Sequence, residues 1–257
     1  MIDLVKMDLY KMTKSGLIKM LFCISVVSAG LMLLFAHLIA TGNQNIQDTG
    51  ITSLFLDSQI FTLLGCIIIG MFLCNDFEYK IIENAISGGH SRSTVVISKI
   101  ISLIILVSII TLPFILSILI AENINLEVSV YMPTAYLSII GHATTGTSAI
   151  YITIQIIVAI IMYSSQLSIG IFLMFLIKKP VIVVALSYVV LLLLGPVLSL
   201  NKTTKNIMEY TPFGIDFTQF GSSLKISNVV EPIFISLIFI IIVTGLSVLF
   251  FKNSEIK

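Results

Sequence analysis

Tryptophan is absent from this 257-residue chain, and charged residues make up only 11% of it. Soluble domains carry about 25% charged residues, whereas here hydrophobic residues reach 57% and the mean hydropathy is +1.11. One core of this size cannot bury so much apolar surface, which excludes an ordinary soluble enzyme. The composition therefore predicts an all-α membrane protein whose apolar surface faces lipid and neighbouring helices.

An excess of charge of either sign is also missing. The 14 basic and 13 acidic residues give a net charge of +1, so the basic surface that a nucleic-acid binder needs is not expected. Cys23, Cys66 and Cys74 lie in apolar runs, where thiols behave as small hydrophobes. We expect neither a disulfide nor a metal site.

Motifs for catalysis or nucleotide binding are missing as well. The sequence contains no G-x-x-x-x-G-K-[ST] loop, no Gly-rich dinucleotide fingerprint, no H-E-x-x-H and no G-x-S-x-G. Its histidines, His37, His90 and His142, are scattered. We therefore expect no catalytic residue, no metal ligand and no cofactor site in this chain, with an intramembrane hydrolase as a minor alternative.

Six apolar runs are long enough to cross a bilayer, for which about 20 residues suffice. Little chain remains for another folded domain, so residues 1–257 are expected to form a single transmembrane domain. The predicted spans cover about residues 17–40, 58–75, 98–121, 149–177, 181–200 and 231–251.

Two shorter segments are predicted to be helical outside the spans. In residues 1–16, Ile2, Val5, Leu9 and Met12 recur at helical spacing, which is typical of an amphipathic helix in the membrane interface. A solvated tail is the alternative. Residues 128–140 are expected to lie as a short helix on the surface.

Basic residues predict the orientation. Of the 14, 11 flank one set of span ends, and only Lys202, Lys205 and Lys225 flank the other. By the positive-inside rule both termini and residues 76–98 are cytoplasmic. Six spans return the chain to its starting side. The distribution of basic residues and the even number of spans therefore both predict a multi-pass cell-membrane protein with cytoplasmic termini.

Ionisable residues are also missing from the interiors of predicted spans 2 to 5. Ion-coupled carriers keep such residues deep in the bilayer, so no proton relay is expected. Energy for uphill transport would then enter from a partner. An ATP-independent carrier or channel and a regulatory membrane protein are the alternatives from other classes.

The longest charged interruption, NDFEYKIIENAISGGHSRSTVVISK, follows the second predicted span. Gly88 and Gly89 predict a turn, Ser91 can cap the next helix, and Phe77 and Tyr79 provide apolar anchors among charges. A solvated loop with an interfacial helix would explain the same pattern.

This interruption resembles the intracellular loop of ABC-2-type permeases. There, acidic residues follow span 2, and a short helix, a Gly-containing turn, Ser-Arg and a Lys lead into span 3. Ile81 and Ile82 replace the usual Gly-Thr, while the six-span order and the N-terminal helix are similar to the family. The matching residues are Asp76, Glu78, Gly88 or Gly89, Ser91, Arg92 and Lys99.

The resemblance implies the membrane subunit of an ATP-driven exporter, without an ATPase site of its own. Two permeases, identical or siblings, would dock on separate ABC ATPase subunits that bind ATP and Mg, with residues 78–87 as the coupling helix. Arg92 would fix the end of this segment or pair with Asp76 or Glu83. The implied ATPase-coupling residues are Asp76, Phe77, Glu78, Tyr79, Glu83, Gly88, Ser91 and Arg92.

Small permeases without a fused ATPase look most like those for lantibiotic immunity, bacitracin resistance and export of cytolytic peptides in Gram-positive bacteria. The implied cargo is an amphipathic or antimicrobial peptide that enters from the membrane, for immunity or secretion. An exporter of a lipid, drug or ion is the alternative within this class.

Small and polar residues form stripes on two predicted spans. Thr62, Cys66, Gly70 and Cys74 recur every four residues, which allows close helix approach. Gln155 and Gln166 lie roughly along one face of the span at 149–177. Helix packing is the preferred explanation, and a substrate path is the alternative.

Overall fold

The computed structural model describes residues 2–42, 50–144, 146–199, 210–215 and 227–253, and these residues contain helices but no strand. Five helical segments are long and apolar enough to cross a membrane, and Pro180–Leu194 is a shorter apolar helix. The five are Gly16–Ala40, Asp57–Glu78, Arg92–Ile124, Ala149–Ile177 and Val229–Asn253. The architecture is thus all-α and compatible with a multi-pass membrane protein.

The helices follow one another with short connections. Their bounds are α1 (Ile2–Lys14), α2 (Gly16–Ala40), α4 (Ile51–Leu54), α5 (Asp57–Ile67), the π-helix η1 (Ile68–Cys74), α6 (Asn75–Glu78), α7 (Ile81–Ser87), α8 (Arg92–Ile124), α9 (Ala135–Ala143), α10 (Ala149–Ile177), α11 (Pro180–Ser199) and α13 (Ser227–Asn253).

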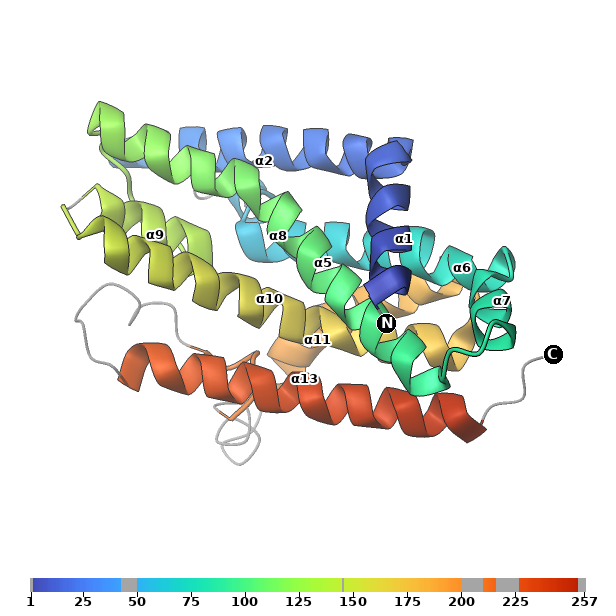
Figure 1. The fold of residues 1–257 in the computed structure, drawn as a ribbon. Helices are drawn as coiled ribbons and strands as arrows, with labels where there is room; N and C mark the ends of the chain where they lie inside the picture. The colour runs from blue at the N-terminus through green and yellow to red at the C-terminus, as the bar shows by residue number, and fades with distance from the viewer. Residues whose placement is uncertain (1, 43–49, 145, 200–209, 216–226, 254–257) are drawn as a thin grey trace.

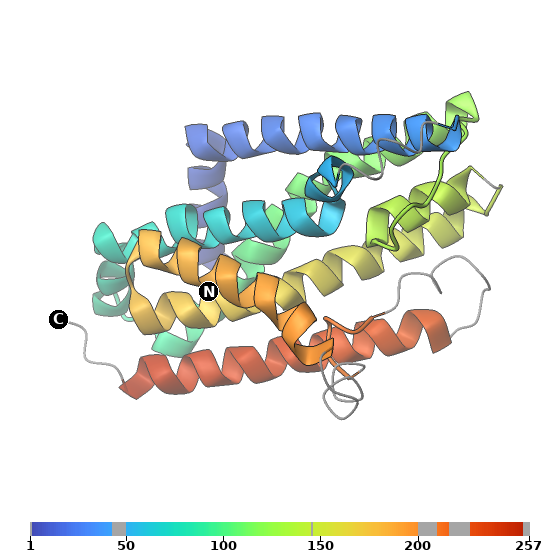
Figure 2. The same cartoon turned by 180° about the vertical axis from the view of Figure 1, so that it is seen from behind.

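The long helices form one bundle in which α10 packs against α8, α11 and α13, while α2 packs against α8. Figures 1 and 2 show α2 and α13 on opposite sides of the bundle. Both expose many large apolar side chains, including Val27 on α2 and Ile241 on α13. Such surfaces suit contact with lipid or with another membrane protein.

Local sequence signals explain where several helices begin and end. Ser91 caps α8 by accepting a hydrogen bond from the backbone N–H of Thr94, as its position predicts. The expected turn also forms at Gly88 and Gly89, and Gly89 has φ +93°, which glycine adopts without steric cost. Pro180 begins α11, where its missing N–H removes no helical hydrogen bond.

The segment Asp57–Glu78 changes from α-helix to π-helix over η1, whose residues pack against α11. A Cβ atom on Gly70 would lie 2.2 Å from Cγ2 of Val184 and 2.8 Å from the carbonyl oxygen of Pro180. Only glycine permits this close approach of backbones. Cys66 and Cys74, on either side of it, are fully buried.

The structure shows which faces of the short helices are buried, and one prediction about them is wrong. The helix expected on the surface at 128–140 is α9, whose residues from Ala135 to Ile140 are buried between other helices, against α8 and α10. In α1 the buried residues are Leu4, Asp8 and Met12, whereas Ile2 is 67% exposed. The buried side of α1 thus includes the charged residue Asp8, which apolar spacing alone does not reveal.

Candidate functional site

The segment expected to contact an ATPase lies at one end of the bundle. We call residues 75–91 the elbow; it contains α6 and α7, and Figures 1 and 2 show it near the C-terminal end of α13. Glu78 is exposed and Tyr79 is 69% exposed, while Glu83 is half-buried. Gly88 and Ser91 are also exposed. These side chains and turns are accessible to another protein.

Two of the predicted coupling residues instead face the interior. Asp76 is completely buried, and Phe77 is partly buried, with its ring centroid 5.7 Å from that of Phe175 and 6.2 Å from that of Phe251. Phe77 therefore packs the elbow against α10 and α13. In this structure, neither residue offers its side chain to a partner.

Asp76 belongs to a buried ion network that joins three elements. The ammonium of Lys99 lies 2.7 Å from Asp8 Oδ1 and 2.5 Å from Asp76 Oδ2. The ammonium of Lys11 lies 2.5 Å from Asp76 Oδ1 and donates to the carbonyl oxygen of Phe72 at 2.9 Å. Ser102 donates to Asp8 Oδ2 at 2.7 Å.

The network holds α1, α6 and α8 together with balanced charge. Asp8 and Asp76 are 0% exposed and Lys99 is 3% exposed, whereas Lys11 is 31% exposed. Two carboxylates face two ammonium groups, so no net charge is buried, and each carboxylate oxygen has a donor. Removing one partner would leave an uncompensated charge in a low-dielectric interior.

This network was not predicted from the sequence. Asp8 was assigned no role, and Lys99 was expected only as the residue that re-enters the membrane. Asp57 and Asp76 lie just outside the predicted span at 58–75, and Lys99 lies near the start of the predicted span at 98–121; all three are buried within the long helices. The available signal was the spacing Leu4, Asp8 and Met12, which places an acid in an apolar stripe.

Arg92 connects the base of the elbow with the last helix. Its Nη1 donates to the carbonyl oxygens of Phe251 and Lys252 at 2.7 and 2.8 Å, and its guanidinium lies 5.6 Å from the Phe251 ring centroid. Asp76, a predicted partner of Arg92, is bound by Lys11 and Lys99. Arg92 thus supplies positive charge at the C-terminal end of α13, where the negative end of the helix dipole favours it.

A second polar group is buried at the far end of the same segment, where α5 begins. Asp57 is fully buried, and its Oδ2 accepts hydrogen bonds of 2.8 Å from the Tyr163 hydroxyl and from the backbone N–H of Tyr136. The second bond caps the start of α9. Within the described part of the chain, Asp57 Oδ1 has no hydrogen-bond partner and no cation pairs with this carboxylate.

Aromatic rings surround Asp57. The Phe61 ring stacks on Tyr163 with centroids 4.6 Å apart, and Tyr136 stacks on Phe61 at 5.5 Å. Outside the long apolar helices, Tyr131 donates to the carbonyl of Thr52 at 3.4 Å. Burial and the nearby charge of Asp57 raise the pKa of Tyr131 to about 12. The rings exclude water from one side of the carboxyl group.

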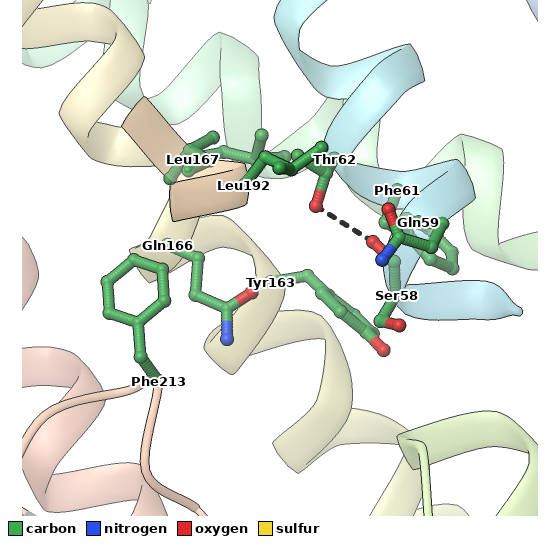
Figure 3. Close-up of a pocket in the computed structure, with 10 residues that line it drawn as sticks. Ser58, Gln59, Phe61, Thr62, Tyr163, Gln166, Leu167, Leu192 and Phe213 are labelled. Carbon is green, nitrogen blue, oxygen red and sulfur yellow. Dashed lines mark hydrogen bonds between the residues drawn. The ribbon is translucent and has the colours of Figure 1, made fainter. Parts of the chain in front are cut away.

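A cavity of about 270 Å³ adjoins this cluster between α5, α10 and α11 (Figure 3). Thr62 and Gln166, which were expected to serve helix packing, both line it. Gln155 is buried elsewhere on α10, and its amide lacks a hydrogen-bond partner among the described residues. The cavity is lined by Ser58, Gln59, Phe61, Thr62, Tyr163, Gln166, Leu167, Leu191, Leu192 and Phe213.

No metal-binding group of three or more His, Cys, Asp or Glu side chains occurs within the residues described. Three basic residues used to predict orientation, Lys202, Lys205 and Lys225, lie outside those residues, as does Lys257. No protein-family model matches the chain, and no curated protein is significantly similar to it. The elbow, the ion network and the cavity are therefore the features of this chain that bear on its function.

Proposed function

We propose that this chain is the membrane subunit of an ATP-driven exporter of the ABC-2 type. In this proposal α11 is the sixth span, both termini and the elbow are cytoplasmic, and a second permease copy or a sibling completes the membrane core. Separate ATPase subunits bind ATP and Mg. The cargo is an amphipathic or antimicrobial peptide that enters from the membrane.

The observation that carries the proposal is the attachment of an exposed elbow to several long helices. Tyr79 projects from the elbow, while Asp76, three residues earlier, is fixed to Lys11 and Lys99 by the buried ion pairs. A partner that displaces the elbow would therefore also pull on α1 and α8. The apolar helices need no charged path to accommodate an amphipathic peptide from the lipid.

A second attachment makes the coupling two-sided. Phe77 packs against Phe175 of α10 and Phe251 of α13, and Arg92 binds the end of α13. The elbow thus contacts both the α1–α8 side and the α10–α13 side of the bundle. Closure of an ATPase on the elbow would change the relative position of these two sides, which is what an exporter requires.

The test uses exposed residues that the fold does not need. Tyr79→Ala combined with Glu78→Lys changes the elbow surface and leaves Asp76 and Phe77 in place. The matched control is Tyr10→Ala on α1, because Tyr10 is 68% exposed and Tyr79 is 69% exposed. The measurements are co-purification with the proposed P-loop ATPase subunits, and ATP hydrolysis and peptide transport by the complex in lipid vesicles.

We expect the elbow variant to lose the ATPase or its transport activity, and the control to retain both. The proposal fails if the elbow variant transports peptide as well as the control does, or if no ATPase associates with the wild-type chain. Integration of each variant into the membrane is checked by its resistance to alkaline extraction.

An ATP-independent carrier is the second candidate, and Asp57 favours it. A buried carboxylate without a cationic partner in the described structure is typical of sites that bind and release a coupling ion. Transport measured with the purified chain alone in lipid vesicles distinguishes the carrier from the ATP-driven exporter. Accumulation of cargo under a pH gradient, lost in Asp57→Asn, would establish a carrier; uptake only with ATPase and ATP would exclude it.

A further inference from the structure

The cavity beside Tyr163 combines apolar walls with polar groups, and none of its described lining residues is charged. Its volume of about 270 Å³ lies just below the range of about 300–1,000 Å³ for sites that hold whole drug-sized ligands. It therefore fits a single side chain or chain end of a larger molecule. Leu192, one of the lining residues, is 42% exposed.

Three of the lining side chains each donate one hydrogen bond within the protein. The Tyr163 hydroxyl donates to Asp57 Oδ2 at 2.8 Å, and the Gln166 amide donates to the carbonyl oxygen of Pro212 at 2.8 Å. The Thr62 hydroxyl donates to the carbonyl oxygen of Ser58 at 2.8 Å. Figure 3 shows these side chains around a common space.

What these groups can still offer a ligand is mainly acceptor capacity. A carboxylate and two carbonyl oxygens are their partners, and since such partners only accept, the side chains must donate. The Gln166 Oε1 and the Thr62 oxygen keep free lone pairs, and Gln166 also keeps its second amide N–H. The Tyr163 oxygen accepts from the backbone N–H of Ala135 and keeps one lone pair. These acceptors come from α5 and α10, and a primary ammonium group has three donors and no acceptor of its own.

We infer that this cavity binds the primary ammonium group of the cargo, from a lysine side chain or a peptide N-terminus. The inference names the substrate class of the proposed exporter and, as far as it concerns transport, rests on that proposed function. Hydrogen bonds from a charged donor are stronger than those from a neutral one, so the site favours an amine over an alcohol.

The surroundings also favour a cation. The stacked rings of Phe61 and Tyr163 line the cavity, and aromatic faces attract ammonium groups, more so where water is excluded. Asp57 lies directly behind the Tyr163 hydroxyl and has no cationic partner in the described residues. Asp57 is a positioning residue here, since its carboxylate turns the phenol proton away from the cavity. The leucines at 167, 191 and 192 accommodate an attached alkyl chain.

Binding is measured with the purified full chain in lipid nanodiscs, with no ATPase present, and empty nanodiscs give the correction for partitioning into lipid. The probes are octylammonium, octyltrimethylammonium and 1-octanol, which share one alkyl chain. We expect saturable binding of octylammonium at neutral pH, at least tenfold tighter than binding of the other two. Equal binding of the three probes, or no saturable binding, would overturn the inference.

Substitutions of lining residues test whether octylammonium binds in this cavity. Gln166→Leu and Thr62→Val each remove one acceptor and should weaken octylammonium binding about tenfold, as expected for one charge-assisted hydrogen bond. Gln155→Leu and Thr153→Val make the same chemical changes on α10 outside the cavity and should leave binding unchanged. Equal effects of the cavity variants and their controls would contradict the assignment.

Gln166→Glu keeps the test decisive if Gln166→Leu does not fold. A carboxylate retains the acceptor and adds negative charge, so octylammonium should bind as tightly as before or more tightly; weaker binding would count against the inference. Because these measurements need no ATPase, they can fail while the elbow experiment succeeds. The cargo would then be exported without capture of its amine in this cavity.

Discussion

Replacement of Lys99 by methionine tests the buried ion network most directly. Methionine has a similar length and no charge, so Asp8 would keep only the hydrogen bond from Ser102 among the contacts described above. Asp8 is 0% exposed, and an uncompensated charge at such a site costs about 3–5 kcal/mol of unfolding free energy. Asp76 would retain Lys11.

Lys11→Met is the matched control. Lys11 pairs with the same Asp76 but is 31% exposed, and partly solvated ion pairs contribute about 0.2–1 kcal/mol. We therefore expect Lys99→Met to be more destabilising than Lys11→Met by at least about 2 kcal/mol. Asp8→Asn should restore part of the stability of Lys99→Met, because it removes the unpaired charge.

The assay uses the cysteines of the chain. Cys66 and Cys74 are buried and Cys23 is exposed, so in a Cys23→Ser background a thiol-reactive dye reports unfolding. A denaturant titration of the detergent-solubilised protein then gives the unfolding free energy. If Lys99→Met and Lys11→Met lose equal stability, or if Asp8→Asn destabilises Lys99→Met further, the network does not stabilise the fold as described.

Two further predictions concern packing and orientation. Gly70→Ala should destabilise the protein by about 1–3 kcal/mol, because the new methyl group overlaps Val184. Gly30→Ala should cost no stability, because a Cβ atom added there meets no other atom within 4 Å. Equal effects of the two substitutions would contradict the close approach of η1 and α11. In a cysteine-free background, a membrane-impermeant thiol reagent should label Tyr79→Cys only from the cytoplasmic side and Ser53→Cys only from outside, and labelling of both from one side would refute the proposed orientation.

The sequence predicted the all-helical class and the local signals of the elbow, because both depend on neighbouring residues. Apolar runs predict long helices wherever they occur, and Ser91 and the two glycines act within one turn of their own positions. The number of spans stays a prediction, since the described part of α11 is shorter than the other long apolar helices.

The ion network could not be predicted because it depends on contacts between distant residues. Asp8 and Lys99 are 91 positions apart, and nothing in either local sequence names the other as a partner. The cavity presented the same difficulty. Thr62 and Gln166 were recognised as polar residues on helix faces, but whether a face packs or lines a space depends on the third element beside it, here α11.

The pairing of Asp8 with Lys99 also has a consequence for the order of assembly. Asp8 leaves the ribosome long before Lys99 exists, so the first helix cannot take its final place while the second segment inserts. Until the third long helix is synthesised, Asp8 must stay hydrated at the membrane surface. The amphipathic character of α1 can retain the N-terminal helix there. Docking of the N-terminus therefore has to wait until the third long helix has been synthesised.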